Sequence, residues 1–186
     1  MKERDNVLRI LIETKRAIID DDPAKIKELS NQTINTASLT QDPDNIAVAV
    51  IVYSIGKIME RENYKELPGW DKFYKIMTDS LDKSIKDVET NHDKKFRRDF
   101  EAIRNAIGKV SGKLKSYIED VFRKGRISKA SRIYEHGISM EQTSKLLGIS
   151  MYELAEYAGK TGIPDAPFSQ TLNAKSRIKI ALEMFE

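Results

Sequence analysis

The stretch SMEQTSKLLGISMYELAEYAGK, residues 139–160, dominates the interpretation of this chain. Ser139 is followed three residues later by Gln142, and Ser150 is followed three residues later by Glu153. This is the spacing of a capping box, in which the side chains at both ends of the box bond to free amides at the start of a helix. The sequence therefore predicts two short helices, each opened by its own serine.

Gly148 lies between these two expected helices, where a sharp turn needs a residue without a Cβ. Leu146 and Leu147 precede it, and Leu154 follows at a position that faces back toward the first helix. Two helices joined in this way have the form of a helix-turn-helix. An ordinary antiparallel helix pair with good caps would show the same pattern, so both interpretations remain at this point.

The second helix of a helix-turn-helix enters the major groove of DNA with its first residues toward the bases. We expect the nucleic-acid contacts of this helix to come from Ser150, Tyr152 and Lys160. Two carboxylates, Glu153 and Glu156, belong to the same exposed face, although most base-reading side chains are cationic or amides. Tyr152, Glu153 and Glu156 therefore form an alternative surface for docking a partner protein.

Positive charge gathers just before the helix pair. Residues 91–136 carry 13 basic and six acidic side chains, whereas residues 1–90 carry 14 basic and 17 acidic ones. A basic segment of this kind is suited to binding phosphates, although a solvated helix surface would show the same charges. The predicted phosphate-binding residues are Arg123, Lys124, Arg126, Lys129 and Arg132.

The remainder of the chain is predicted to be helical, so the expected fold class is all-α. Asp22-Pro23 and Asp42-Pro43 are helix-start signals, because the carboxylate caps free amides and proline suits the first helical position. Apolar residues at helical spacing predict helices at about 2–20, 23–37, 43–63, 70–88 and 174–185. We expect three parts: an N-terminal helical bundle at 1–90, a long basic helix at 91–125, and a helix-turn-helix region with a C-terminal helix at 126–186.

The long helix is predicted from eight apolar residues spaced alternately by four and three: Phe96, Phe100, Ile103, Ile107, Val110, Leu114, Tyr117 and Val121. Such a heptad pattern is typical of a helix that packs along its whole length against another helix. The partner is either the N-terminal bundle of the same chain or a second copy. In the second case a homodimer would form through Phe100, Ile103, Ile107, Val110 and Leu114. A separate short helix is expected at 128–136.

The composition argues against several classes of protein. The chain has no cysteine and only two histidines, so neither thiolate nor histidine metal sites are expected. We find no glycine-rich phosphate loop and no pairing of a nucleophile with a base, which predicts no enzymatic activity, catalytic residue or cofactor. Because the longest apolar run, residues 46–53, is too short to cross a bilayer, we expect a cytoplasmic protein without membrane contact.

Residues 129–165 resemble a family of small prokaryotic helix-turn-helix proteins described as antitoxin-like. The shared features are the Tyr-x-x-Gly ending at 134–137, the Ile-Ser pair at 138–139, the Gly-Ile-Ser turn at 148–150 and the Gly-Ile-Pro ending at 162–164. The resemblance implies a regulator that binds DNA. The rest of the chain resembles only unannotated archaeal helical proteins.

Together these features predict a non-enzymatic nucleic-acid-binding regulator, with DNA as the expected ligand and RNA as the other candidate. The alternative is a helical adaptor whose helix-turn-helix docks a partner protein.

Overall fold

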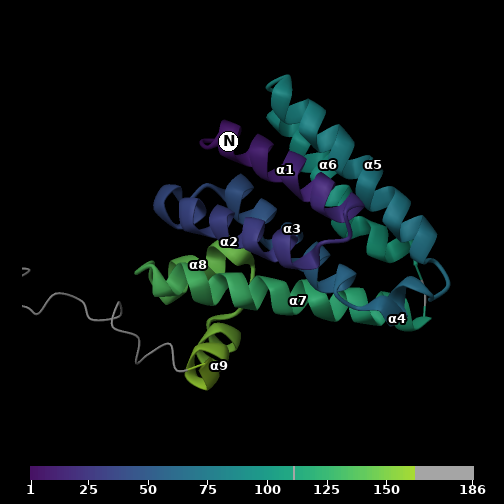
Figure 1. Ribbon diagram of the computed structural model, residues 1–186. Coiled ribbons are helices and arrows are strands. Elements are labelled where there is room, and N and C mark those ends of the chain that lie inside the picture. The colour runs from purple at the N-terminus through teal and green to yellow at the C-terminus, as the bar shows by residue number, and fades with distance from the viewer. Residues whose placement is uncertain (111, 162–186) are drawn as a thin grey trace, which may run out of the picture.

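The computed structural model describes residues 1–110 and 112–161, and within this part of the chain every regular element is a helix (Figure 1). The all-α fold class is therefore confirmed. The helix expected at 174–185 lies outside the described residues, as does the end of the segment that resembles the antitoxin-like family.

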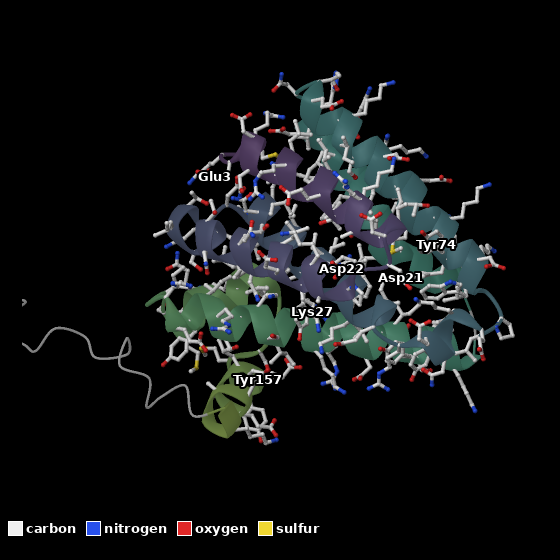
Figure 2. All side chains as sticks on the ribbon, in the orientation of Figure 1. Glu3, Asp21, Asp22, Lys27, Tyr74 and Tyr157 are labelled. Atoms are coloured by element: carbon white, nitrogen blue, oxygen red, sulfur yellow. The ribbon has the colours of Figure 1, made fainter. Side chains whose placement is uncertain are left out.

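The first three helices are α1 (Arg4–Ile19), α2 (Pro23–Thr40) and α3 (Pro43–Met59). Both aspartate–proline signals open a helix as predicted. The Asp22 carboxylate accepts a hydrogen bond from the Lys25 amide at 2.9 Å, and Asp42 accepts one from the Asp44 amide at 3.0 Å. Figure 2 shows Asp22 beside Asp21 at the turn between α1 and α2. The local aspartate caps and the prolines thus explain where α2 and α3 begin.

A short helix, α4 (Glu62–Lys65), leads through a loop to α5 (Trp70–Glu89), and α6 (Asp93–Asn105) returns along α5. The α5–α6 pair packs against α1 on one side of the bundle (Figure 1).

The prediction of a single long helix at 91–125 is wrong. The chain leaves α6 at Asn105, passes through a short 3-10 turn at Ala106–Lys109 and starts α7 (Gly112–Glu135) only afterwards. Gly112 has a φ of 63°, in the left-handed region that favours glycine, and glycine also weakens a helix interior by about 1 kcal/mol. Since α7 continues to Glu135, the separate helix expected at 128–136 is also part of it.

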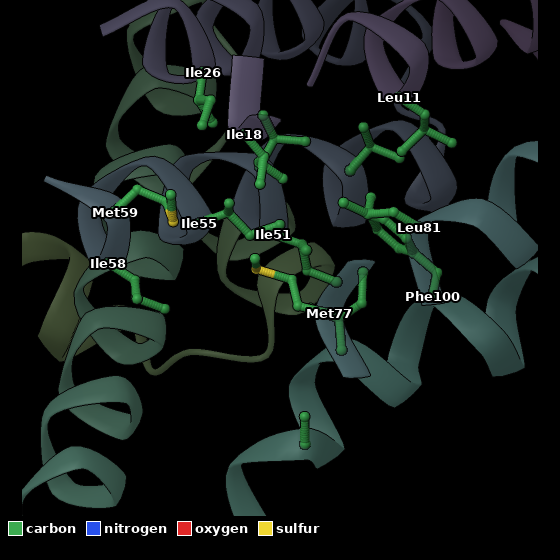
Figure 3. Packing of buried hydrophobic residues seen from close by; sticks show 14 of the residues in the cluster. Leu11, Ile18, Ile26, Ile51, Ile55, Ile58, Met59, Met77, Leu81 and Phe100 are labelled. Carbon is green, nitrogen blue, oxygen red and sulfur yellow. The ribbon is translucent and has the colours of Figure 1, made fainter. Parts of the chain in front are cut away.

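The main core joins segments from both sides of position 90. In Figure 3, Ile18 of α1, Ile51 and Ile55 of α3, and Met77 of α5 belong to one cluster that also includes residues of α6 and α7. The predicted dimer residues Phe100, Ile103, Val110 and Leu114 are buried in this same cluster. These four side chains are therefore not available to a second copy, because they complete the core of their own chain.

A second, smaller core connects the last two described helices to the bundle. Helices α8 (Met140–Leu147) and α9 (Met151–Thr161) contribute Leu147 and Leu154, which pack with Ile46 of α3 and Ile133 of α7. Figure 1 shows α9 beyond α7, at the edge of the bundle. No described helix combines the length and the apolar character needed to cross a membrane.

Candidate nucleic-acid interface

Each helix of the α8–α9 pair begins at its predicted serine, but the capping box predicted at α8 is only half formed, because the Gln142 side chain donates to Gln41. Ser139 caps α8 by accepting a hydrogen bond from the Gln142 amide at 3.2 Å. Gly148 ends α8 with a φ of 61°, a conformation that is strained for residues with a Cβ. Thr143, Leu154 and Ala158 are buried, and Leu154 belongs to the second core. The α8–α9 pair is therefore held by its own caps and by the second core.

The start of α9 has a complete capping box. The Ser150 amide donates to Glu153 Oε2 at 3.0 Å, and the Glu153 amide donates to Ser150 Oγ at 3.1 Å. The backbone amide of Ser150, then its hydroxyl, hold the pKa of Glu153 below its ordinary value, with smaller contributions from Arg123 and Arg126 of α7. The Glu153 carboxylate thus accepts its hydrogen bonds from Ser150 within the cap.

The second carboxylate on the exposed face of α9 is also engaged. Glu156 Oε1 lies 2.5 Å from Lys160 Nζ, one helical turn away. Because this pair cancels its own charge, and Glu153 belongs to the cap, the exposed face of α9 is less acidic in effect than its sequence indicates.

The arginines of α7 reach the α8–α9 turn. Arg126 Nη1 donates to the carbonyl oxygen of Gly148 at 3.4 Å. Arg123 and Lys124 lie one turn earlier on α7 and share the carboxylate of Asp120, at 3.3 and 2.6 Å. The structure therefore brings Arg123 and Arg126 close to the start of α9, as their influence on the pKa of Glu153 also indicates.

Arg132 lies further along α7 and is exposed, with Glu135 as an ion-pair partner at 3.1 Å. Of the five predicted phosphate-binding residues, Arg123, Lys124 and Arg132 are exposed and Arg126 is half-buried.

The prediction that Lys129 binds phosphate is wrong. Only 1% of this residue is exposed. Its Nζ donates to Asn31 Oδ1 at 2.8 Å and lies 4.4 Å from the centre of the Tyr53 ring. Burial, with the nearby charge of Arg132, lowers the pKa of Lys129 to about 8. Lys129 therefore belongs to the packing of α7 against α2 and α3.

Two large apolar side chains are exposed at the start of α9. Met151 is 54% exposed and Tyr152 is 76% exposed. Methionine and tyrosine are enriched in the cores of protein interfaces, so both side chains are candidates for contact with another molecule.

A groove lined partly by Arg123 and Arg126 could not be predicted from the sequence. It has a volume of about 640 Å³ and lies between α3, α6, α7 and α8. On α7 the lining residues recur at helical spacing, as Glu119, Phe122, Arg123 and Arg126, but the other walls come from residues about 20 to 80 positions away along the chain. The pattern on α7 could have indicated one wall, whereas the opposite walls depend on tertiary packing.

Within residues 1–110 and 112–161, no three histidine, aspartate or glutamate side chains come together in a way that could hold a metal ion. We find no match to this chain among protein-family models, curated proteins or solved structures.

Proposed function

We propose that this protein is a non-enzymatic DNA-binding regulator in which α8 and α9 act as a helix-turn-helix. The observation that carries the proposal is the bond from Arg126 to the carbonyl of Gly148 in the α8–α9 turn. It places Arg126, with Arg123 one turn earlier on α7, beside the first turn of α9, the part of a recognition helix that meets base edges.

Two kinds of contact follow from this arrangement. Arg123, Lys124, Arg126 and Arg132 bind phosphates and position the protein on the duplex. Ser150 and Tyr152, both exposed at the start of α9, contact base edges, and Lys160 binds the backbone at the other end of the helix. Since the intrahelical ion pairs of α7 and α9 are exposed, they cost little to exchange for phosphate contacts.

The direct test is the binding of a mixed-sequence DNA duplex, measured by fluorescence anisotropy at several salt concentrations. Replacing Arg123 and Arg126 together by glutamine should lower affinity and reduce the slope of log K against log salt by about 2, one unit for each lost phosphate contact. The matched control is the double change of Lys72 and Lys75 to glutamine on α5. It removes the same charge from exposed positions on another helix.

Equal losses in the two double variants would contradict the proposed interface, because affinity would then follow net charge alone. Absence of salt-dependent binding in the unmodified protein would contradict the function. A parallel titration with structured RNA separates the two kinds of nucleic acid.

The second candidate function is a protein-interaction adaptor that docks a partner through the start of α9. The exposure of Tyr152 favours it, because tyrosine is enriched at protein interfaces. Changing Glu156 to lysine should weaken capture of a stable protein partner, while it should preserve or strengthen DNA binding if the main proposal is correct. Recovery of nucleic acid alone would argue against the adaptor.

A further inference from the structure

The groove beside Arg126 has an apolar floor. Ile46, Ala47, Val50 and Ile51 of α3, Phe96 and Phe100 of α6, and Phe122 of α7 supply it. Leu146 and Leu147 close the end nearest the α8–α9 turn. A volume of about 640 Å³ lies within the range of pockets that bind small molecules.

Four arginines and three carboxylates line the same groove, but they are not equally free. Arg97 makes a bidentate contact to Asp44, at 2.8 and 3.0 Å, and Arg104 is paired with Glu101. The positive charge of each of these two arginines is therefore paired with a neighbouring carboxylate.

Arg123 and Arg126 differ from them. Arg123 lies 3.3 Å from Asp120, a carboxylate that Lys124 approaches more closely at 2.6 Å. Arg126 has no carboxylate within ion-pair distance in the described part of the chain, and it donates a hydrogen bond to a backbone carbonyl at 3.4 Å. With Glu119 as the remaining acidic neighbour, this part of the groove keeps an excess of positive charge beside apolar surface.

We propose that the groove binds a small amphipathic carboxylate, a medium-chain fatty acid or a molecule of that class. Its hydrocarbon chain lies on the apolar floor, and its carboxylate accepts hydrogen bonds from the guanidinium groups of Arg123 and Arg126. Guanidinium–carboxylate bonds are charge-assisted, and they bind an anion more strongly than neutral donors do.

The proposal also assigns a regulatory consequence, which rests on the proposed function. Arg123 and Arg126 are the residues that would hold DNA phosphates. A carboxylate bound to them therefore excludes those phosphates, so the ligand and DNA compete for one pair of cations. The ligand site itself does not depend on DNA binding.

The test uses decanoate, below the concentration at which it self-associates, and measures its binding to the full chain by calorimetry without DNA. Decyltrimethylammonium has the same chain length and the opposite charge, and hexanoate has the same head group and a shorter chain. We expect saturable 1:1 binding of decanoate that is at least about tenfold tighter than that of either control ligand. Equal affinity for decanoate and decyltrimethylammonium, or no saturable binding of decanoate, would overturn the proposal.

Two variants locate the ligand. Ala47→Trp places a large side chain on the groove floor and leaves both arginines in place, and it should weaken decanoate binding by about tenfold or more. The double change of Arg123 and Arg126 to glutamine should weaken it similarly, whereas the double change of Lys72 and Lys75 should not. Because the ligand controls need no variant, a failure of Ala47→Trp to fold leaves the proposal testable.

The regulatory consequence is tested separately. If the protein binds DNA, decanoate should lower its affinity, and Ala47→Trp should bind DNA but lose this sensitivity. Binding of decanoate by a protein that does not bind DNA would reject the proposed function and retain the ligand site. Binding of DNA without binding of decanoate would reject the ligand site and retain the proposed function.

Discussion

The ammonium group of Lys129 on α7 lies 4.4 Å from the centre of the Tyr53 ring on α3. Asn31 of α2 accepts a hydrogen bond from this ammonium group, so Lys129 connects three helices. Burial lowers its pKa from 10.5 to about 8. At neutral pH the folded protein therefore holds a buried charge that is stabilised by an aromatic ring and an amide oxygen without a carboxylate.

This charge should make stability depend on pH. Between pH 8 and 10.5 the unfolded chain binds the proton of Lys129 more tightly than the folded chain does. The free energy of unfolding should consequently rise as pH increases through this range, as far as Lys129 is concerned. Lys129→Met removes the charge, and exposed Asn31 can bond to water instead. We expect it to stabilise the protein by about 1–3 kcal/mol at pH 7 in urea denaturation, and less at pH 10.

Lys124→Met is the matched control. Its side chain is 68% exposed, so the same substitution should change stability by less than about 0.5 kcal/mol at either pH. A loss of stability in Lys129→Met at pH 7 would mean that the contacts to Tyr53 and Asn31 outweigh the cost of burying the charge.

Lys129 also shows why part of the site could not be predicted from the sequence. The caps at Asp22, Asp42 and Ser150 depend on residues two or three positions away, and they were predicted correctly because that chemistry is local. The burial of Lys129 depends on Asn31, 98 positions away.

The apolar spacing from Phe96 to Val121 was misleading for a related reason. The alternating spacing of four and three continues in the sequence across the turn at Ala106–Lys109, although α6 ends at Asn105 and α7 begins at Gly112. Periodicity identified residues of the core but not the direction of the chain between them.

The burial of the residues predicted to form a homodimer leads to a second prediction. Leu114 is 1% exposed and lies in the main core. Leu114→Ala should lower the free energy of unfolding by about 2–5 kcal/mol, with a midpoint that does not depend on protein concentration. Leu39→Ala truncates the same side chain at a position that is 86% exposed, so it should change stability little. A midpoint that rises with protein concentration, and loses this dependence in Leu114→Ala, would instead support a dimer through this residue.

The capping box of α9 leads to a third prediction. Ser150→Ala removes the acceptor of the Glu153 amide and should cost about 1 kcal/mol, confined to α9 because the cap is local. Hydrogen exchange should show faster opening of α9 while α3 is unaffected. Ser150→Asn, which retains a capping oxygen, should largely restore protection, and failure of both variants in the same way would argue against capping as the cause.

The carboxylate of this capping box should also respond to acid. The pKa of Glu153 in the folded chain lies below its ordinary value of 4.5, so the unfolded chain takes up the proton first as pH falls. The contribution of Glu153 to stability should be complete above about pH 4.5 and should be lost as pH falls through the folded pKa. Glu153→Gln should flatten this part of the pH dependence of α9 exchange, and an unchanged profile would contradict the assignment.

The close contact between α7 and α3 at Gly125 leads to the last prediction. Gly125 lies where an added Cβ would stand 2.6 Å from Ser54 Oγ and 3.4 Å from Tyr53 Cδ1. Because both helices are held by the main core, they cannot separate freely, and Gly125→Ala should destabilise the protein by about 1–3 kcal/mol. Ser54→Ala removes the nearest atom, so the double variant should recover much of the loss in urea denaturation.

Gly159→Ala is the control: a Cβ there meets nothing within 4 Å, and the change should stabilise α9 slightly because alanine favours helix. If Gly125→Ala were as stable as the unmodified protein, with or without Ser54→Ala, α7 would not pack against α3 at this distance, and the groove that the two helices line would be formed differently.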